Sequence, residues 1–309
     1  MRITVMGTGG LGGYIGGRLA HAGADVTFIA RGQQLQAISQ NGIQVQSVHG
    51  GFAVAPVRAT SNPAEVGPVD LVLFCVKAYD AEVAAAQIKP LVGEQTAILP
   101  VLNGIDHLET LSTVLGPAHV LGGVSQITAH VIAPGLIEQV SANHTVDLGE
   151  LSGVLSDRCR QIQQALAVSG IEVAVTPTIV EKMWWKLSVI CGLSGVCSVA
   201  RSGAGAIAQT PETLALIHQA VAECVAVAQA SRISLSPALP DQIVNFVKNA
   251  STTLKPSMLV DLEHARRLEV EALNGKISRL GKAMAVPTPV NDFIYACLKP
   301  HANGGQPQQ

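Results

Sequence analysis

The chain has 309 residues, of which 48% are hydrophobic, 14% are charged and 3% are aromatic, and its net charge is −2. This length and apolarity suit two domains with buried cores and exclude a disordered chain. The charge offers no basic surface for nucleic acid or an anionic membrane, and aromatic residues are too few to stack bases, so we expect neither partner.

The first 30 residues predict a strand, a glycine turn, a helix and a second strand. ITVMG is a short β-branched run typical of a buried parallel strand. The helical segment GYIGGRLAHAG and the strand-like ADVTFIA follow the turn. No long apolar segment precedes the turn, so we expect no signal peptide.

The turn between them, Gly7-Thr8-Gly9-Gly10-Leu11-Gly12, has the spacing G-x-G-x-x-G that binds dinucleotides in this context. Gly7 permits the tight turn, Gly9 lets a pyrophosphate approach the backbone, and Gly12 lets the helix pack on the strand. Free amides at the helix N-terminus then hold the anion. The alternative is a glycine-rich turn without a ligand.

The end of the second predicted strand indicates which dinucleotide binds. An acidic residue there would hold the ribose 2′-hydroxyl of NAD, but the strand ends FIARG, with Arg31 at that place. A guanidinium offers a planar fork to a phosphate dianion, so the sequence predicts NADP(H). The alternative is a surface arginine in a turn.

Two more predicted strands end in polar residues. DLVLFCVKAYD contains Lys77 and TAILPVLNGID contains Asn103, each directly after an apolar run. Ligands bind at the carboxyl ends of strands in doubly wound sheets. We expect Lys77 to contact cofactor or substrate and Asn103 the nicotinamide-side ribose or the substrate, although each is also compatible with a turn residue. HVLGGVSQITAHV and VDLGE extend the predicted sheet toward residue 150.

The second half of the chain has a helical pattern. LSDRCRQIQQALAVSG predicts an amphipathic helix and IEVAVTP a last strand, and long helical patterns then cover residues 179–193, 210–231 and 257–284. We therefore predict an α/β Rossmann-type doubly wound N-terminal domain, residues 1–178, and an all-α C-terminal domain for substrate and dimerisation, residues 179–309. The tail GGQPQQ is expected to fray.

The cysteines and histidines do not indicate a metal site. None of the six cysteines forms a C-x-x-C pair, and the nine histidines have no H-x-x-x-H spacing. We expect free, buried thiols in a reducing cytoplasm and no metal.

Lys186 is the only charge in WWKLSVICGLSGVCSVA, and fourteen uncharged residues follow it. This run is shorter than the roughly 20 apolar residues that cross a bilayer, so we expect a buried helix. From the pattern alone, Lys186 either does chemistry or extends its charged end to solvent, with its stem on Trp184 or Trp185.

Together these segments resemble the ketopantoate reductase family over nearly the whole chain. The resemblance rests on GTGGLGGYIGGRLAHAGADVTFIARG, VKAYD, LNGIDHLE, APGLIE, LGEL, WWKL and PSMLVDLEHARRLEVEALNG. Family members reduce a 2-oxo acid, 2-dehydropantoate, to pantoate with NADPH.

The resemblance implies roles for individual residues. Gly7, Gly9, Gly12 and Arg31 match the NADP-binding turn and its phosphate-binding arginine, while Lys77 and Asn103 match the lysine and asparagine of the family motifs. Lys186 matches the catalytic lysine of W-x-K-L, a general acid beside the substrate carbonyl. Ser257 matches a serine that binds the substrate carboxylate, and Glu269 a glutamate near the reacting centre, both on one late helix.

Three positions depart from the family pattern. Ile190 and Ser194 stand where the family has asparagines four and eight residues after the lysine, and Leu254 replaces another three residues before the serine. Loss of an amide at Ile190 favours a more apolar 2-oxo acid or ketone, or the matching alcohol. A true ketopantoate reductase that tolerates the changes is the first alternative.

Two further alternatives are a non-catalytic NADP(H)-sensing protein and another two-domain dehydrogenase, acting on 3-hydroxy acids. The small residues Gly192, Gly195 and Gly203 suit close packing, either against a second copy in a homodimer or within their own domain.

Overall fold

The computed structural model describes residues 1–305, so the last four residues of the predicted frayed tail lie outside the described part. Contacts along the chain divide it into two compact units. Unit 1 comprises residues 1–102 and 107–179; unit 2 comprises residues 103–106 and the chain from Val180 onward. The boundary after residue 178 stays a prediction; the contact division places Ile179 with unit 1 and the short segment 103–106 with the helical unit.

Unit 1 is built on a parallel five-stranded sheet of order β5-β2-β1-β6-β7. The chain order reverses on either side of β1, which is the arrangement of a doubly wound dinucleotide-binding sheet. In spatial order the strands are β5 (Arg58–Thr60), β2 (Asp25–Ile29), β1 (Arg2–Met6), β6 (Leu71–Phe74) and β7 (Ala97–Pro100).

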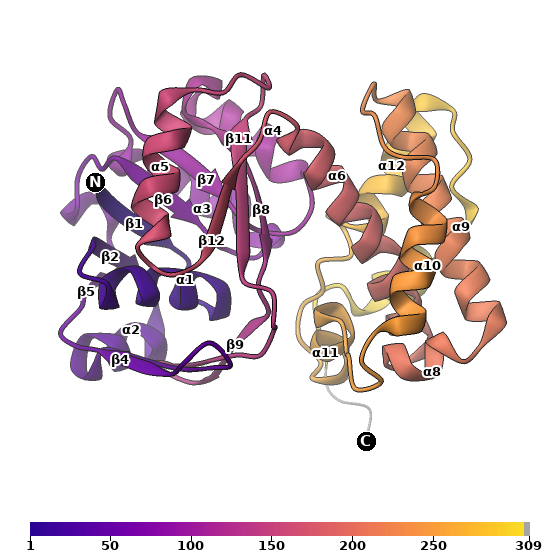
Figure 1. Ribbon diagram of the computed structural model, residues 1–309, viewed down its shortest axis with the longest axis horizontal. Helices are drawn as coiled ribbons and strands as arrows, with labels where there is room; N and C mark the ends of the chain where they lie inside the picture. The colour runs from indigo at the N-terminus through magenta and orange to yellow at the C-terminus, as the bar shows by residue number, and fades with distance from the viewer. Residues whose placement is uncertain (306–309) are drawn as a thin grey trace. The chain divides into compact units, whose positions relative to one another are not determined.

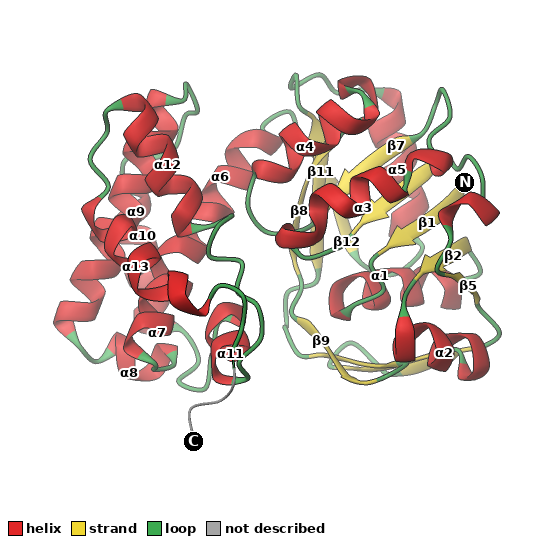
Figure 2. Ribbon diagram, turned by 180° about the vertical axis from the view of Figure 1, so that it is seen from behind, coloured by secondary structure: helices red, strands yellow, loops and turns green. Residues whose placement is uncertain are grey.

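Helices cover both faces of this sheet because its strands are apolar on both sides. Ile3 and Val5 share a core with residues of α1 and α5, whereas Met6 shares a second core with residues of α3 and α4. Figure 1 shows α1 and α5 in front of the sheet, and Figure 2 shows α3 and α4 in front of its other face. The helices are α1 (Gly10–His21), α2 (Gly32–Asn41), α3 (Ala81–Gln87), α4 (Asp106–Leu115) and α5 (Asp157–Ala167).

Two smaller sheets complete unit 1. One has the order β12-β11-β8. An isolated parallel bridge connects it to β7, between Ile98 of β7 and Val120, the residue directly before β8. The other has the order β4-β3-β10-β9, so the segment HVLGGVSQITAHV supplies strands to two different sheets. The strands are β3 (Ile43–Ser47), β4 (Phe52–Val54), β8 (Leu121–Gln126), β9 (Ala129–Ala133), β10 (Leu136–Gln139), β11 (Thr145–Glu150) and β12 (Glu172–Val175).

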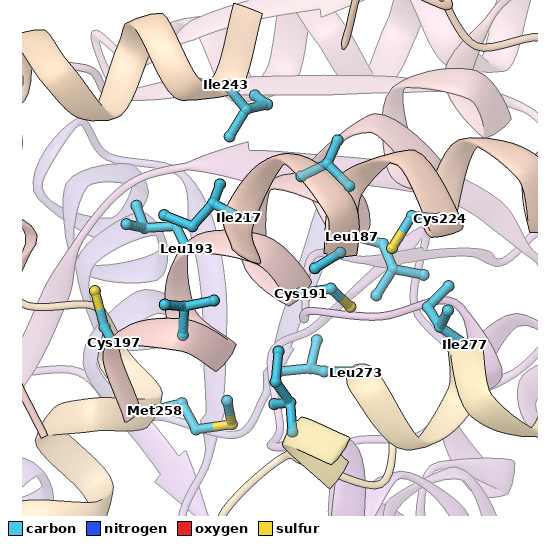
Figure 3. Close-up of a cluster of buried hydrophobic side chains, with 14 of the residues drawn as sticks. Leu187, Cys191, Leu193, Cys197, Ile217, Cys224, Ile243, Met258, Leu273 and Ile277 are labelled. Carbon is cyan, nitrogen blue, oxygen red and sulfur yellow. The ribbon is translucent and has the colours of Figure 1, made fainter. Parts of the chain in front are cut away.

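Unit 2 is helical, as predicted, and no strand occurs among its described residues. Its core includes Leu187, Cys191, Cys224, Leu273 and Ile277, which Figure 3 draws as one cluster. Its elements are α6 (Ile179–Val189), a π-helical turn η5 (Ile190–Ser194), α7 (Gly195–Ala200), α8 (Ala204–Ala208), α9 (Pro211–Ala230), α10 (Leu239–Asn249), α11 (Ser257–Glu263), α12 (Asn274–Met284) and α13 (Pro289–Leu298).

The single helix predicted over residues 257–284 is wrong. Helix α11 ends at Glu263, and α12 begins only at Asn274. Ala265 adopts the left-handed conformation with φ +51°, the Arg266 amide donates to Asp261 O, and the Ala265 amide donates to Leu262 O. This is a Schellman end, which usually carries glycine. With alanine at that position, the helical pattern of the sequence gives no stop signal.

Two apolar helical segments of unit 2, Ile179–Ala200 and Pro211–Ala230, are long enough to cross a bilayer by length and composition. Both contribute side chains to the core of unit 2, as core helices of soluble proteins do. All six cysteines are free; four are buried, but Cys297 is exposed and Cys75 is half-buried, so the expectation of buried thiols fails at these two.

Candidate functional site

The glycine turn follows β1 directly, and its glycines are required by close backbone contacts. Gly7 has φ +95°, where a side chain would be strained. A Cβ on Gly12 would lie 2.3 Å from Gly7 O, and a Cβ on Gly10 would lie 2.2 Å from Ala129 O. The turn therefore has its present shape only with glycine at these places.

Gly9 differs from its neighbours because a Cβ there would meet nothing within 4 Å. It is the N-cap of α1, and no side chain caps the helix or puts an acid in its first turn. The first amides of this twelve-residue helix therefore have no side-chain cap, and the space beside Gly9 is open. Such an end attracts anions through unpaired N–H groups and the helix dipole, so the turn fits a dinucleotide pyrophosphate.

Thr8 and Gln34 fix this turn against the rest of unit 1. Buried Thr8 donates its hydroxyl to Ile29 O at the end of β2, at 3.0 Å. Gln34 Nε2 donates to Thr8 O at 3.0 Å, and the Gly135 amide donates to Gln34 Oε1 at 2.9 Å. Gln34 was missed by sequence reasoning, since one glutamine among several in a polar segment carries no signal. Leu11 is partly buried and packs against the core that α1 shares with the sheet.

Arg31 lies at the carboxyl end of β2, as predicted, and begins α2 as its N-cap. The side chain is 70% exposed, and its guanidinium lies 3.8 Å from the Asp80 carboxylate. An exposed pair of this kind contributes little stability, so the guanidinium is available to a phosphate. Asp80 belongs to the VKAYD segment, and its place opposite Arg31 is a feature that sequence reasoning did not identify.

The register of the sheet brings Lys77 to the same edge. Met6 pairs with Ile29 on one side and with Phe74 on the other, so β1, β2 and β6 end together. Lys77 is half-buried and comes three residues after β6. The glycine turn, Arg31 and Lys77 therefore share the carboxyl edge of the sheet.

Asn103 is held by unit 2, although it follows a strand of unit 1. Gly104 has φ +86°, and a Cβ there would lie 2.9 Å from Ala272 O. Asp106 forms ion pairs with Lys276 and with Arg279 of α12. These contacts anchor residues 103–106 on the helical unit, and sequence reasoning missed them because the partners are about 170 residues apart in the chain.

Unit 2 brings together three of the predicted site residues. The Asn103 side-chain amide donates to Glu269 Oε2 in a long hydrogen bond of 3.5 Å. Glu269 is buried and interacts electrostatically with Lys186 of α6. Glu269 lies in the segment between α11 and α12, so the expectation that it shares a helix with Ser257 is wrong.

Burial lowers the pKa of Lys186 from 10.5 to about 8, and the carboxylate of Glu269 partly opposes this shift. The cause is the cost of burying an ammonium ion, which favours the neutral amine. A lysine with this pKa can hold or release a proton near neutral pH. Trp184 is buried and Trp185 is partly exposed on the same helix.

The remaining predicted substrate residues are more scattered. Ile190 is half-buried and packs on the core of unit 2; Ser194 is buried, and its hydroxyl has no hydrogen-bond partner among the described residues. Ser257 is exposed at the start of α11. No hydrogen bond within residues 1–305 joins it to Lys186, Asn103 or Glu269. Leu254 also packs on the core.

Metal ligands are not clustered in the part of the chain that the structure describes: no group of three or more His, Cys, Asp or Glu side chains there could hold an ion.

Two family models match the chain. Residues 3–153 match the model described as ketopantoate reductase PanE/ApbA, and residues 178–302 match its C-terminal counterpart. Among curated relatives, 2-dehydropantoate 2-reductase of Mesorhizobium japonicum is 31% identical over 97% of this chain and 97% of its own.

Solved structures agree with this relationship. The 2-dehydropantoate 2-reductase from Geobacter metallireducens superposes with a TM-score of 0.91 at 28% identity, covering 97% of this chain and 99% of its own. A D-mandelate dehydrogenase in complex with NADH superposes with a TM-score of 0.88 at 25% identity, covering 97% and 98%. With matches over both units, the chain belongs to the ketopantoate reductase family, whose members are oxidoreductases that interconvert C=O and CH–OH groups.

Proposed function

We propose that this protein is an NADP(H)-dependent oxidoreductase that interconverts a 2-oxo acid and its 2-hydroxy acid. The observation that carries the proposal is Lys186, whose pKa is lowered to about 8 beside Glu269. Asn103 reaches the same carboxylate. Lys186 is a proton donor, Glu269 is a negative charge that raises the pKa of that donor, and Asn103 offers an amide for hydrogen bonding. Such groups suit the reduction of a carbonyl.

The residues of unit 1 fit the cofactor. Open space in front of Gly9 and the uncapped end of α1 suit its pyrophosphate. Arg31 would hold the 2′-phosphate, because its guanidinium is exposed and its ion pair with Asp80 is long and weak. Lys77 of unit 1 is another candidate contact, and so is Asn103, which belongs to unit 2. When bound, NADPH supplies the hydride that adds to the carbonyl carbon.

The residues of unit 2 supply the proton that the substrate carbonyl oxygen receives during reduction. Lys186 donates the proton of its Nζ to the carbonyl oxygen as negative charge develops there. With its pKa near 8, the lysine is mostly protonated at neutral pH and still acidic enough to transfer the proton. Glu269 raises the pKa of Lys186 and so favours its protonated form before the reaction. Asn103 offers its side-chain amide to the nicotinamide-side ribose or to the substrate.

The substrate is ketopantoate or a more apolar 2-oxo acid. Ile190 presents hydrocarbon where an asparagine would bind a hydroxyl, and Ser194 and Ser257 are the neighbouring polar candidates. A D-mandelate dehydrogenase of the same fold supports the second candidate, oxidation or reduction of an acid with an apolar side chain. A cytoplasmic location and a homodimer are parts of this proposal that rest on the sequence.

The test is oxidation of NADPH by the purified protein with ketopantoate, phenylglyoxylate and aliphatic 2-oxo acids. We expect turnover of at least one acid, with the apolar acids ahead of ketopantoate. Ketopantoate as the best substrate would support a true ketopantoate reductase. Tight NADPH binding without turnover of any acid would favour the sensing protein, and turnover of 3-hydroxy acids alone would favour the other dehydrogenase class.

A further inference from the structure

A π-turn directly follows α6, the helix that carries Lys186. Residues Ile190–Ser194 form this turn between α6 and α7. The Gly195 amide, which would bond to Cys191 O in an α-helix, bonds instead to Ile190 O and Gly192 O. The Gly195 amide therefore does not bond to the Cys191 carbonyl, which can accept from a side chain.

Asn274, the first residue of α12, supplies that donor. Its side chain is 0% exposed, and Nδ2 donates to Cys191 O at 3.1 Å. The second hydrogen on Nδ2 goes to Asn291 Oδ1 at 2.9 Å. A Cβ on Gly195 would lie 3.0 Å from Asn274 Nδ2, so the helix also needs glycine to approach this close.

A buried carboxylate determines which way the Asn274 amide points. Glu223 of α9 is 3% exposed and accepts the amides of Val290 and Asn291 at the start of α13, each at 2.9 Å. Asn291 Nδ2 also donates to Glu223 Oε2 at 2.8 Å. Asn291 Nδ2 also donates to Ala220 O at 3.0 Å, and a carbonyl oxygen only accepts, so Asn291 must turn its NH₂ group toward Ala220 and Glu223 and its oxygen toward Asn274.

Asn274 must then present its own NH₂ group to both Asn291 Oδ1 and Cys191 O. A flipped Asn274 would set its oxygen against two other oxygens. This orientation costs free energy of folding, because Asn274 Oδ1 is buried without a hydrogen-bond partner among the described residues. The chain Glu223–Asn291–Asn274 thus ends on the backbone of the π-turn.

We infer that Asn274 is a positioning residue: it holds the π-turn and so fixes the direction in which Ile190 and Ser194 project relative to Lys186. A π-turn closes with i→i+5 hydrogen bonds, so it rotates the chain less per residue than an α-turn. Ile190 and Ser194 are its first and last residues. This inference rests on the proposed function, since these two side chains are the proposed substrate contacts.

The test replaces Asn274 by Ala and by Ser, which keeps one hydroxyl donor. The matched control is Ile277→Ala, which opens a cavity one helical turn further along α12 at a residue that is also 0% exposed. We measure kcat and KM for ketopantoate and for phenylglyoxylate, the dissociation constant of NADPH, and hydrogen exchange of the peptide covering residues 190–196.

For Asn274→Ala we expect kcat/KM for the preferred acid to fall about tenfold or more, and the ratio between the two acids to change, because misplaced groups lose catalytic geometry. Asn274→Ser should recover part of both. NADPH affinity should stay as in the parent, and exchange at residues 190–196 should rise. Ile277→Ala should unfold more easily yet keep the parental ratio and the parental exchange at the π-turn.

An unchanged acid ratio in both Asn274 variants would overturn the inference while leaving the proposed function intact. So would an equal change of the ratio in Ile277→Ala, because any loss of packing would then have the same effect. A parent that oxidises NADPH with no acid would overturn the proposed function and this inference together.

Discussion

The glycine turn of unit 1 and the π-turn of unit 2 are both departures from regular structure beside a predicted site, but different interactions hold them. The shape of the glycine turn requires close contacts that leave no room for a Cβ at Gly7, Gly10 or Gly12, and the Thr8 and Gln34 side chains only add hydrogen bonds to it. The π-turn is fixed by side chains, through the buried amide of Asn274 and the carboxylate behind it.

This difference has a consequence for how each site can vary. Backbone amides at a helix N-terminus can bind a pyrophosphate without a specific side chain, so the proposed cofactor site rests on a few glycines and on Arg31. A substrate pocket made of side chains changes with single substitutions such as asparagine to Ile190. We therefore expect sharp separation between variants of the two units: cofactor affinity should respond to unit 1, and substrate choice and proton transfer to unit 2.

Lys186→Ala should have the largest effect. Loss of a general acid typically costs about 10²- to 10⁴-fold in rate, so we expect kcat for reduction to fall by that factor with NADPH affinity unchanged. Lys182→Ala, one turn earlier on the same helix, is the control and should retain activity. Steady-state kinetics and fluorescence titration of NADPH measure both. Equal losses of kcat in the two variants would contradict the role of Lys186 as the general acid.

Arg31→Ala should come second and affect the cofactor alone. Hydrogen bonds to a charged group contribute about 1.5–3 kcal/mol, so the preference for NADPH over NADH should fall by roughly 10- to 100-fold. The matched control is Arg58→Ala, an exposed arginine paired with Asp25 at the opposite end of β2. The readout is kcat/KM with each nucleotide. A preserved ratio would remove Arg31 from the cofactor site.

Two glycine variants separate stability from cofactor binding. A Cβ at Gly12 collides with Gly7 O, so Gly12→Ala should destabilise the fold by about 1–3 kcal/mol. Gly9→Ala meets open space, so it should keep the parental stability and lose NADPH affinity. Urea unfolding and NADPH titration of the two proteins measure this contrast. Parental NADPH affinity in a folded Gly9→Ala protein would show that the anion does not approach there.

Ile190→Asn should have the smallest effect on rate, but it should shift the preference between substrates toward ketopantoate. It restores an amide where the family has one, and a hydrogen bond of about 1 kcal/mol would shift the kcat/KM ratio toward ketopantoate by roughly fivefold. Ile190→Leu controls for the change in shape. A ratio that moves equally in both variants would mean that Ile190 acts through packing.

The sequence predicted the local features of this molecule well. The β–turn–α–β unit, the helical second half and the positions of Arg31 and Lys77 at strand ends follow from short patterns, because glycine spacing and apolar periodicity act over a few residues. The family resemblance added the importance of Lys186, which its helix pattern alone left open between chemistry and a surface lysine.

A helix end without its usual glycine, and features that depend on distant contacts, could not be predicted. The helix break after Glu263 relies on Ala265 in a left-handed conformation, which nothing in the pattern marks. Asn103 belongs with the helical unit because Asp106 pairs with Lys276 and Arg279, far along the chain. The π-turn needs Asn274, 83 residues beyond Cys191 in the sequence.

The central claim is that Lys186 donates the proton, with a pKa that burial lowers and Glu269 partly restores. The most direct measurement is the pH dependence of kcat/KM for reduction, in the parent and in Glu269→Gln. Lys186 must be protonated to act, so the parent should lose activity as the pH rises past about 8. Glu269 raises that pKa, so removing its charge should move the fall to lower pH. Activity that stays constant well above pH 8, or a midpoint that Glu269→Gln leaves unmoved, would contradict the account.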